Sequence, residues 1–139
     1  MKHKAIPKKL RQQVYDKYGG HCAYCGCELE RDNFQVDHAK SLWHTYIEKR
    51  VESNFQFHDD SPEANQDDSI ENLMPACKQC NYYKDSMDIE NFRKAILETL
   101  SHTCIDTFAT RLAMKYGMIT YTPWDGKFYF EKQETKLKE

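Results

Sequence analysis

Cys22-Ala23-Tyr24-Cys25 and Cys77-Lys78-Gln79-Cys80 are the two stretches that decide the fold of this chain. Each presents two thiols three positions apart, and a long insert separates them. Two such pairs have the spacing of a tetrahedral zinc site, so we expect Cys22, Cys25, Cys77 and Cys80 to bind one structural Zn²⁺. Four reduced core cysteines are the alternative. A closed thiolate site has no open coordination position, so it would organise the fold rather than catalyse, and Cys27 and Cys104 are then spare thiols.

Length and composition bound the class of protein. The chain has 139 residues, of which 40% are hydrophobic, which suits a single domain spanning residues 1–139. No apolar run is long enough to span a membrane, and the charged N-terminus is unlike a secretory signal. We therefore expect a cytoplasmic protein without a membrane partner, in a compartment where cysteines bind metal more readily than they form disulfides.

The pattern of apolar residues predicts an α+β fold. Residues 7–18 have helical periodicity, residues 34–38 alternate as a strand, Leu73-Met74 suits a short return strand, and residues 77–86 suit a helix. This gives a strand-strand-helix core over about residues 20–87. Two further helices and a β-hairpin, with strands at residues 118–121 and 127–130 around Trp124-Asp125-Gly126, are expected over about residues 88–131. The insert at residues 39–71 is too long for a plain loop, and we expect a short helix near residues 42–51.

Charge is unevenly distributed along the chain. Residues 1–17 contain six lysines and arginines and one acid, whereas residues 59–71 contain six acids and no base. A cationic first helix can neutralise phosphates, which makes Lys8, Lys9 and Arg11 candidate nucleic-acid contacts. An ordinary solvated helix face is the alternative explanation.

A second set of polar residues lies between and after the cysteine pairs. Val36-Asp37-His38, the segment from Asp67 to Leu73 and the segment from Cys77 to Lys84 occur in that order. In this order and setting they resemble the HNH endonucleases of the ββα-metal class, in their zinc-knuckle form. The resemblance covers roughly residues 7–94.

The resemblance implies a role for each matching residue. Asp37 and Asn81 would bind a catalytic Mg²⁺ or Mn²⁺, His38 would be the general base, and Asn72 would brace the loop that carries the histidine. Lys84 would contact a flanking phosphate, with a solvent-facing helix lysine as the alternative. The implied activity is hydrolysis of phosphodiester bonds in double-stranded DNA, giving 5′-phosphate and 3′-hydroxyl ends.

The chain departs from the usual family pattern at several positions. Asn81 stands where many relatives have histidine, Ala39-Lys40 follow His38, and the insert is long. Two other classes of function remain open: a zinc-stabilised nucleic-acid-binding module without catalysis, and a protein-interaction domain that docks through the acidic insert. The sequence also leaves open whether two copies of the chain associate.

Overall fold

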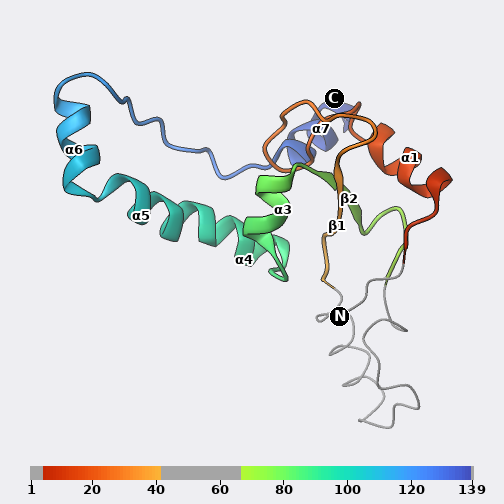
Figure 1. Cartoon of the computed structure of the whole chain (residues 1–139). Coiled ribbons are helices and arrows are strands. Elements are labelled where there is room, and N and C mark those ends of the chain that lie inside the picture. The colour runs from red at the N-terminus through yellow and green to blue at the C-terminus, as the bar shows by residue number, and fades with distance from the viewer. Residues whose placement is uncertain (1–4, 42–66, 139) are drawn as a thin grey trace, which may run out of the picture. The chain divides into compact units, whose positions relative to one another are not determined.

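The computed structural model describes residues 5–41 and 67–138, in which helices and a small antiparallel sheet form an α+β fold (Figure 1). The chain divides into two compact units. Unit 1 comprises residues 1–88 and 128–139, and unit 2 comprises residues 89–127. The sequence predicted a single domain over residues 1–139, and the structure divides the chain into these two units. The helix expected near residues 42–51 lies outside the described residues.

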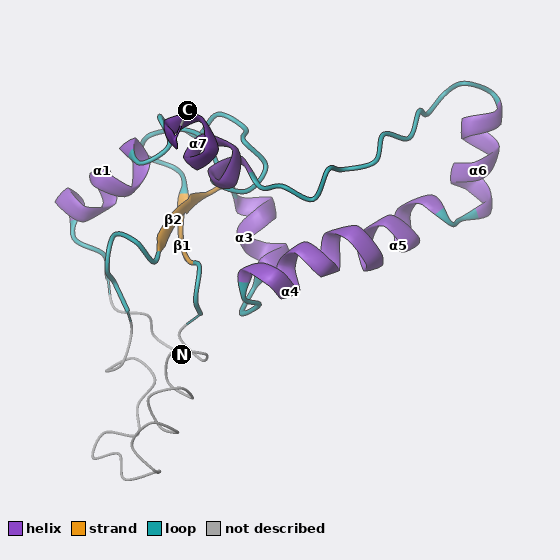
Figure 2. Cartoon of the chain, turned by 180° about the vertical axis from the view of Figure 1, so that it is seen from behind, coloured by secondary structure: helices purple, strands orange, loops and turns teal. Residues whose placement is uncertain are grey.

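A two-stranded antiparallel sheet forms the centre of unit 1. Its strands are β1 (Gln35–His38) and β2 (Leu73–Ala76), and His38 pairs with Leu73 at one end of the ladder. Helices α1 (Lys8–Asp16) and α3 (Lys78–Lys84) lie on opposite sides of this sheet (Figure 1 and Figure 2). The predicted order of strand, strand and helix is confirmed.

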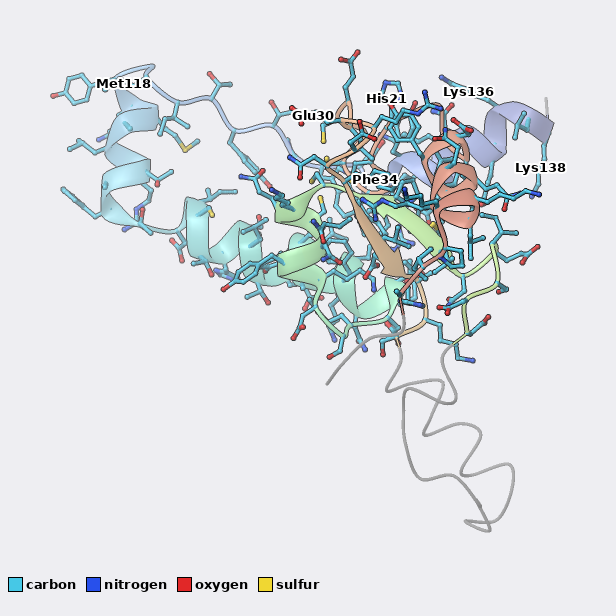
Figure 3. All side chains as sticks on the ribbon, turned by 45° about the vertical axis from the view of Figure 1, so that its right-hand side comes forward. His21, Glu30, Phe34, Met118, Lys136 and Lys138 are labelled. Carbon is cyan, nitrogen blue, oxygen red and sulfur yellow. The ribbon has the colours of Figure 1, made fainter. Side chains whose placement is uncertain are left out.

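The core on the α1 side of the sheet is small and apolar. Val14, Phe34 and Leu73 are buried together, and Leu10 and Val36 pack around them. Phe34 lies at the start of β1 beside α1 (Figure 3). Full burial of such side chains stabilises a fold by roughly 1.5 to 3 kcal/mol each, so this cluster fixes α1 against the sheet.

The chain end returns to unit 1 as a helix, α7 (Tyr129–Lys138), and not as the second strand of a hairpin. The expected turn is present, since Gly126 has a φ of 79° and the Lys127 N–H donates to Asp125 Oδ1 at 3.0 Å. The predicted hairpin is nevertheless wrong, because the Glu131 carboxylate accepts the Phe128 N–H at 2.8 Å. A glutamate that reaches back to the residue before a helix satisfies one of its unpaired donors and favours the helix start.

Helix α7 attaches to the first cysteine pair. The Tyr129 N–H donates to Tyr24 O at 3.0 Å, and the Phe130 N–H donates to Ala23 O at 2.8 Å. The Phe128 ring packs edge-on against Tyr24, with centroids 5.5 Å apart. A terminal segment that is read from sequence as a separate hairpin is therefore part of the frame around the cysteines.

Unit 2 consists of consecutive helices, which bear out the helical periodicity seen after Asp88. They are α4 (Ile89–Lys94), the π-helical segment η2 (Ala95–Leu100), α5 (Ser101–Ile105) and α6 (Phe108–Lys115). Thr107 caps α6 by accepting the Thr110 N–H, and Gly117, with a φ of 72°, follows its end. Met118, which was expected to begin a strand, lies in the irregular segment beyond α6 (Figure 3).

Candidate functional site

The cysteines of the two pairs converge in unit 1. The sulfur atoms of Cys22, Cys25, Cys27 and Cys77 all lie within 4.8 Å of one another, and Cys25 Sγ is 3.9 Å from Cys77 Sγ. Zinc–sulfur bonds of about 2.3 Å at the tetrahedral angle place two sulfurs about 3.8 Å apart, which matches this separation. The cluster can therefore hold a metal ion such as zinc.

Local backbone structure positions the sulfurs. In the first pair, the Cys22 N–H donates to Cys27 O at 2.8 Å and Gly26 adopts a φ of 82°, so the chain turns back within six residues. In the second pair, Cys77 precedes α3 and its sulfur accepts the Cys80 N–H at 3.4 Å. The Ala23 N–H donates to Pro75 O at 2.8 Å, which holds the first pair beside the end of β2.

The cluster contains five thiols, although the sequence predicted four. Cys80 belongs to it because its thiol hydrogen-bonds to Cys22 and Cys25. The sulfur of Cys27, interpreted as a spare thiol from the sequence, lies within 4.8 Å of those of Cys22, Cys25 and Cys77. Cys27 is not part of either CxxC pair, so the spacing of the cysteines did not predict its position. The turn after Cys25 returns it to the cluster. Cys104 lies in unit 2, outside the cluster.

The thiols titrate unequally because they hydrogen-bond to one another. Hydrogen bonds from Cys22 and Cys80 lower the pKa of Cys25 to about 3. Desolvation, with the neighbouring Cys25, raises the pKa of Cys27 to about 12, and the hydrogen bonds to Cys22 and Cys25 raise the pKa of Cys80. One thiolate is thus held by its neighbours, an arrangement that favours a bound cation.

Asp37 on β1 is buried on the α3 side of the sheet. Its Oδ2 accepts a hydrogen bond from the Tyr24 hydroxyl and lies 2.9 Å from Lys84 Nζ. Burial, and then the Asp37 carboxylate, raise the pKa of Tyr24 well above its usual value, so Tyr24 is a permanent donor. Both partners use Oδ2, and within the described part of the chain Oδ1 accepts no hydrogen bond.

Lys84 differs from expectation. Its side chain is 0% exposed, and Nζ also donates to His38 O at 2.9 Å. The prediction that Lys84 contacts a phosphate is therefore wrong, because its ammonium faces a carboxylate and a backbone carbonyl instead of solvent. The CxxC spacing places Lys84 one turn after Cys80, on the helix face that packs inward.

His38 ends β1 and has a carboxylate partner. Its Nε2 lies 2.9 Å from Asp68 Oδ1, and its side chain is 14% exposed. An ionised carboxylate can only accept, so in a neutral imidazole the proton of this bond is on Nε2 and the lone pair is on Nδ1. Asp68 was given no role of its own from the sequence, although it lies in the acidic run and in the segment from Asp67 to Leu73. A histidine followed at a distance by adjacent aspartates would have been the signal.

Asn72 ties together the two segments that flank the insert. Its Oδ1 accepts the Lys40 N–H at 2.8 Å, and its Nδ2 donates to Lys40 O at 3.1 Å and to Asp67 O at 2.9 Å. The side chain is buried, and three of its hydrogen bonds go to backbone groups. This is the bracing role implied by the resemblance, and it fixes both the residues after His38 and those before Asp68.

Asn81 lies on α3, and its carboxamide has no hydrogen-bonding partner among the described residues. The structure does not join Asp37, His38 and Asn81 by any side-chain hydrogen bond within those residues. Side chains alternate along a strand, so His38 belongs to the Val36 side of β1 and Asp37 to the α3 side. Among the described residues, the cysteines form the only group of three or more histidine, cysteine or acidic ligand atoms.

The basic helix is only partly free to bind phosphates. Lys8 and Lys9 are exposed on α1. Arg11 instead donates to Phe34 O and lies over the Phe34 ring at 4.2 Å, so it serves the core. The prediction that Arg11 contacts nucleic acid is therefore corrected as well: its guanidinium binds Phe34.

Comparisons of the chain with protein-family models, curated proteins and solved structures found no significant match. No described helix has both the length and the apolar character needed to cross a bilayer.

Proposed function

We propose that the chain is a zinc-stabilised, metal-dependent endonuclease that hydrolyses phosphodiester bonds in DNA. The observation that carries the proposal is the pairing of His38 with Asp68 at 2.9 Å. A carboxylate that holds one ring nitrogen of a neutral histidine leaves the other to accept a proton from water. The loop around this pair is fixed by Asn72 on both sides.

Two oxygen donors on the α3 side of the sheet suit a hard divalent cation. Asp37 Oδ1 and the carboxamide oxygen of Asn81 are oxygen donors without hydrogen-bonding partners in the described residues, and Mg²⁺ and Mn²⁺ prefer oxygen ligands. When bound, the ion would supply stabilisation of the charge that develops on the phosphate. Lys84 competes for the same carboxylate, so occupancy of Asp37 by a cation would be weaker than at a free carboxylate.

Each residue of the chain would have a distinct task. His38 would take the proton from the attacking water, Asp68 would hold the imidazole in the tautomer with Nδ1 unprotonated, and Lys8 and Lys9 would bind phosphates of the duplex. General-base catalysis of this kind contributes roughly 10²- to 10⁴-fold to a rate. The thiol cluster would take no part in the reaction. It would hold β2, α3 and the first cysteine pair together.

The experiment is cleavage of supercoiled plasmid by the zinc-loaded chain with Mg²⁺ or Mn²⁺. His38→Ala should abolish cleavage at unchanged zinc content. His102→Ala is the matched control, because His102 is an exposed histidine, 81% accessible, in unit 2. Intact plasmid with each metal ion, or cleavage by His38→Ala at the wild-type rate, would overturn the proposal.

A second function is favoured by the ion pair of Asp37 with Lys84. A carboxylate that is already neutralised at 2.9 Å by a buried ammonium has less need of a metal ion. The chain would then be a zinc-stabilised nucleic-acid-binding module. Binding of an oligonucleotide without cleavage, at one zinc per chain, would distinguish this function.

A further inference from the structure

A shallow depression of about 440 Å³ lies in unit 1 where the start of β1 meets α3. It is lined by Gln35, Lys78, Gln79, Asn81 and Tyr82. Four of these residues lie within residues 78–82 of α3, so they share one side of the helix. The strand contributes Gln35, which is on the same side of β1 as Asp37.

The lining residues share an unused capacity to bind. None of their side chains makes a hydrogen bond or ion pair with another described residue, and the three carboxamides each supply donors and an acceptor. Lys78 adds an exposed ammonium. Side chains of this kind usually point apart into solvent, whereas here they surround one depression.

Tyr82 gives the depression an aromatic wall. Its side chain is 88% exposed, although a tyrosine ring is a large apolar surface that usually packs against the protein. Lys78 and Tyr82 are four residues apart on α3, which places them on one face of the helix. An exposed ring beside a cation is the arrangement on which an unpaired base stacks while its phosphate is neutralised.

We propose that this depression binds one unstacked nucleobase and its flanking phosphate. Tyr82 stacks on the base, Gln35 and Gln79 bind its edge, and Lys78 binds the phosphate. A nucleotide offers a flat π face, hydrogen-bonding edges and an anion within one unit, which are the three features that these side chains can bind. The inference rests on the proposed function, because it assigns a part of the nucleic-acid substrate to a place beside Asn81.

The test is fluorescence anisotropy of a labelled single-stranded oligonucleotide, and of its duplex, with the full zinc-loaded chain. All proteins carry His38→Ala, so that no strand is cut. Tyr82→Ala should weaken single-strand binding by about 5- to 150-fold, the effect of losing one stacked base. Tyr82→Phe keeps the ring and should bind as the parent does. Tyr116→Ala is the matched control, since Tyr116 is 77% exposed and lies in unit 2.

Lys78→Ala gives an independent readout. It should reduce the slope of log K against log salt by about 0.7, the value for one phosphate contact on a single strand. The inference is overturned if Tyr82→Ala binds the single strand as tightly as its parent, or if Tyr82→Ala weakens binding of the duplex as much as binding of the single strand.

The outcomes separate this inference from the endonuclease proposal. If the wild-type chain cuts plasmid but Tyr82→Ala binds as its parent does, the base site fails and the nuclease stands. If no plasmid is cut but Tyr82→Ala weakens binding and Tyr82→Phe does not, the base site stands and catalysis fails. If no oligonucleotide is bound and no plasmid is cut, both fail.

Discussion

At the residue scale, the contact between His38 and Asp68 is the feature on which the proposed role of His38 depends. A histidine with a fixed tautomer needs a partner that can only accept, and Asp68 Oδ1 at 2.9 Å fulfils this condition. Asp68→Asn keeps the size of the side chain but adds a donor that can bind Nε2 in the wrong tautomer. We expect the plasmid cleavage rate to fall roughly 10²-fold or more, with zinc content unchanged. Asp106→Asn, at an exposed aspartate in unit 2, should cut normally; equal rates for both variants would remove Asp68 from the mechanism.

The buried ion pair of Lys84 and Asp37 gives a prediction at the same scale. Lys84→Met retains the volume of the side chain but leaves the Asp37 carboxylate without its cation. Breaking a buried pair costs about 3 to 5 kcal/mol, measured here as the free energy of unfolding in urea without divalent ions. If Asp37 binds Mg²⁺ or Mn²⁺, either ion should restore part of this loss and raise the melting temperature of Lys84→Met more than that of the wild type.

Exposed Lys9 provides the control for this measurement. Lys9→Met should change neither stability nor the response to divalent ions. An identical response of wild-type and Lys84→Met proteins to Mg²⁺ and Mn²⁺ would show that Asp37 is not a cation ligand, and would favour the binding module.

The fifth thiol can be assigned by zinc content. Cys27 and Cys80 both lie against the sulfurs of Cys22 and Cys25, and a tetrahedral ion needs only two ligands beyond that pair. With Cys77 as the third, we expect Cys27→Ser and Cys80→Ser each to retain one zinc per chain, and the double variant to lose it. Loss of zinc in Cys80→Ser alone would restrict the site to the two CxxC pairs, and Cys104→Ser serves as the control for a thiol outside the cluster.

At the scale of secondary-structure elements, the sequence predicted what depends on local spacing. Paired cysteines, alternation at residues 34–38 and helical periodicity at residues 7–18 are short-range signals, and β1, β2, α1 and α3 follow them. Asn72 could be placed as a brace because the resemblance supplied its role. The burial of Lys84, the inward use of Arg11 and the partnership of His38 with Asp68 could not be predicted, because each joins residues that are distant along the chain.

Helix α7 shows how a capping interaction overrides an apolar pattern. Aromatic residues at 128–130 favour a strand by propensity, but the Glu131 carboxylate binds the Phe128 N–H and the following residues are good helix formers. Glu131→Ala should lower the free energy of unfolding by about 1 kcal/mol in urea titrations. Lys136→Ala, at an exposed position on the same helix (Figure 3), should leave it within about 0.5 kcal/mol; equal effects would remove the cap as the cause.

At the scale of the whole molecule, the thiol cluster is the point where the parts of unit 1 meet. The first cysteine pair is hydrogen-bonded to β2 through Pro75 O and to α7 through Ala23 O. The second cysteine pair lies at the start of α3. The apolar core beside the cluster is small, so a metal ion bound to the cluster would supply much of the stability. A structural zinc ion contributes roughly 10 to 16 kcal/mol, comparable with the roughly 7 to 20 kcal/mol expected for a chain of this size.

Removal of zinc should therefore unfold unit 1 rather than loosen it. Cys77→Ser, or a strong chelator on the wild-type protein, should abolish the cooperative thermal transition in circular dichroism, and Zn²⁺ added back after chelation should restore it. Asp37→Ala removes a buried partner of Lys84 but no thiol, so it should still bind one zinc and unfold cooperatively, at a lower temperature. A chelated protein with an unchanged melting temperature would show that unit 1 holds together without a metal. The aromatic contacts of Tyr24 with Phe128 and Phe130, and the backbone hydrogen bonds from α7, would then be sufficient to keep the first cysteine pair in place.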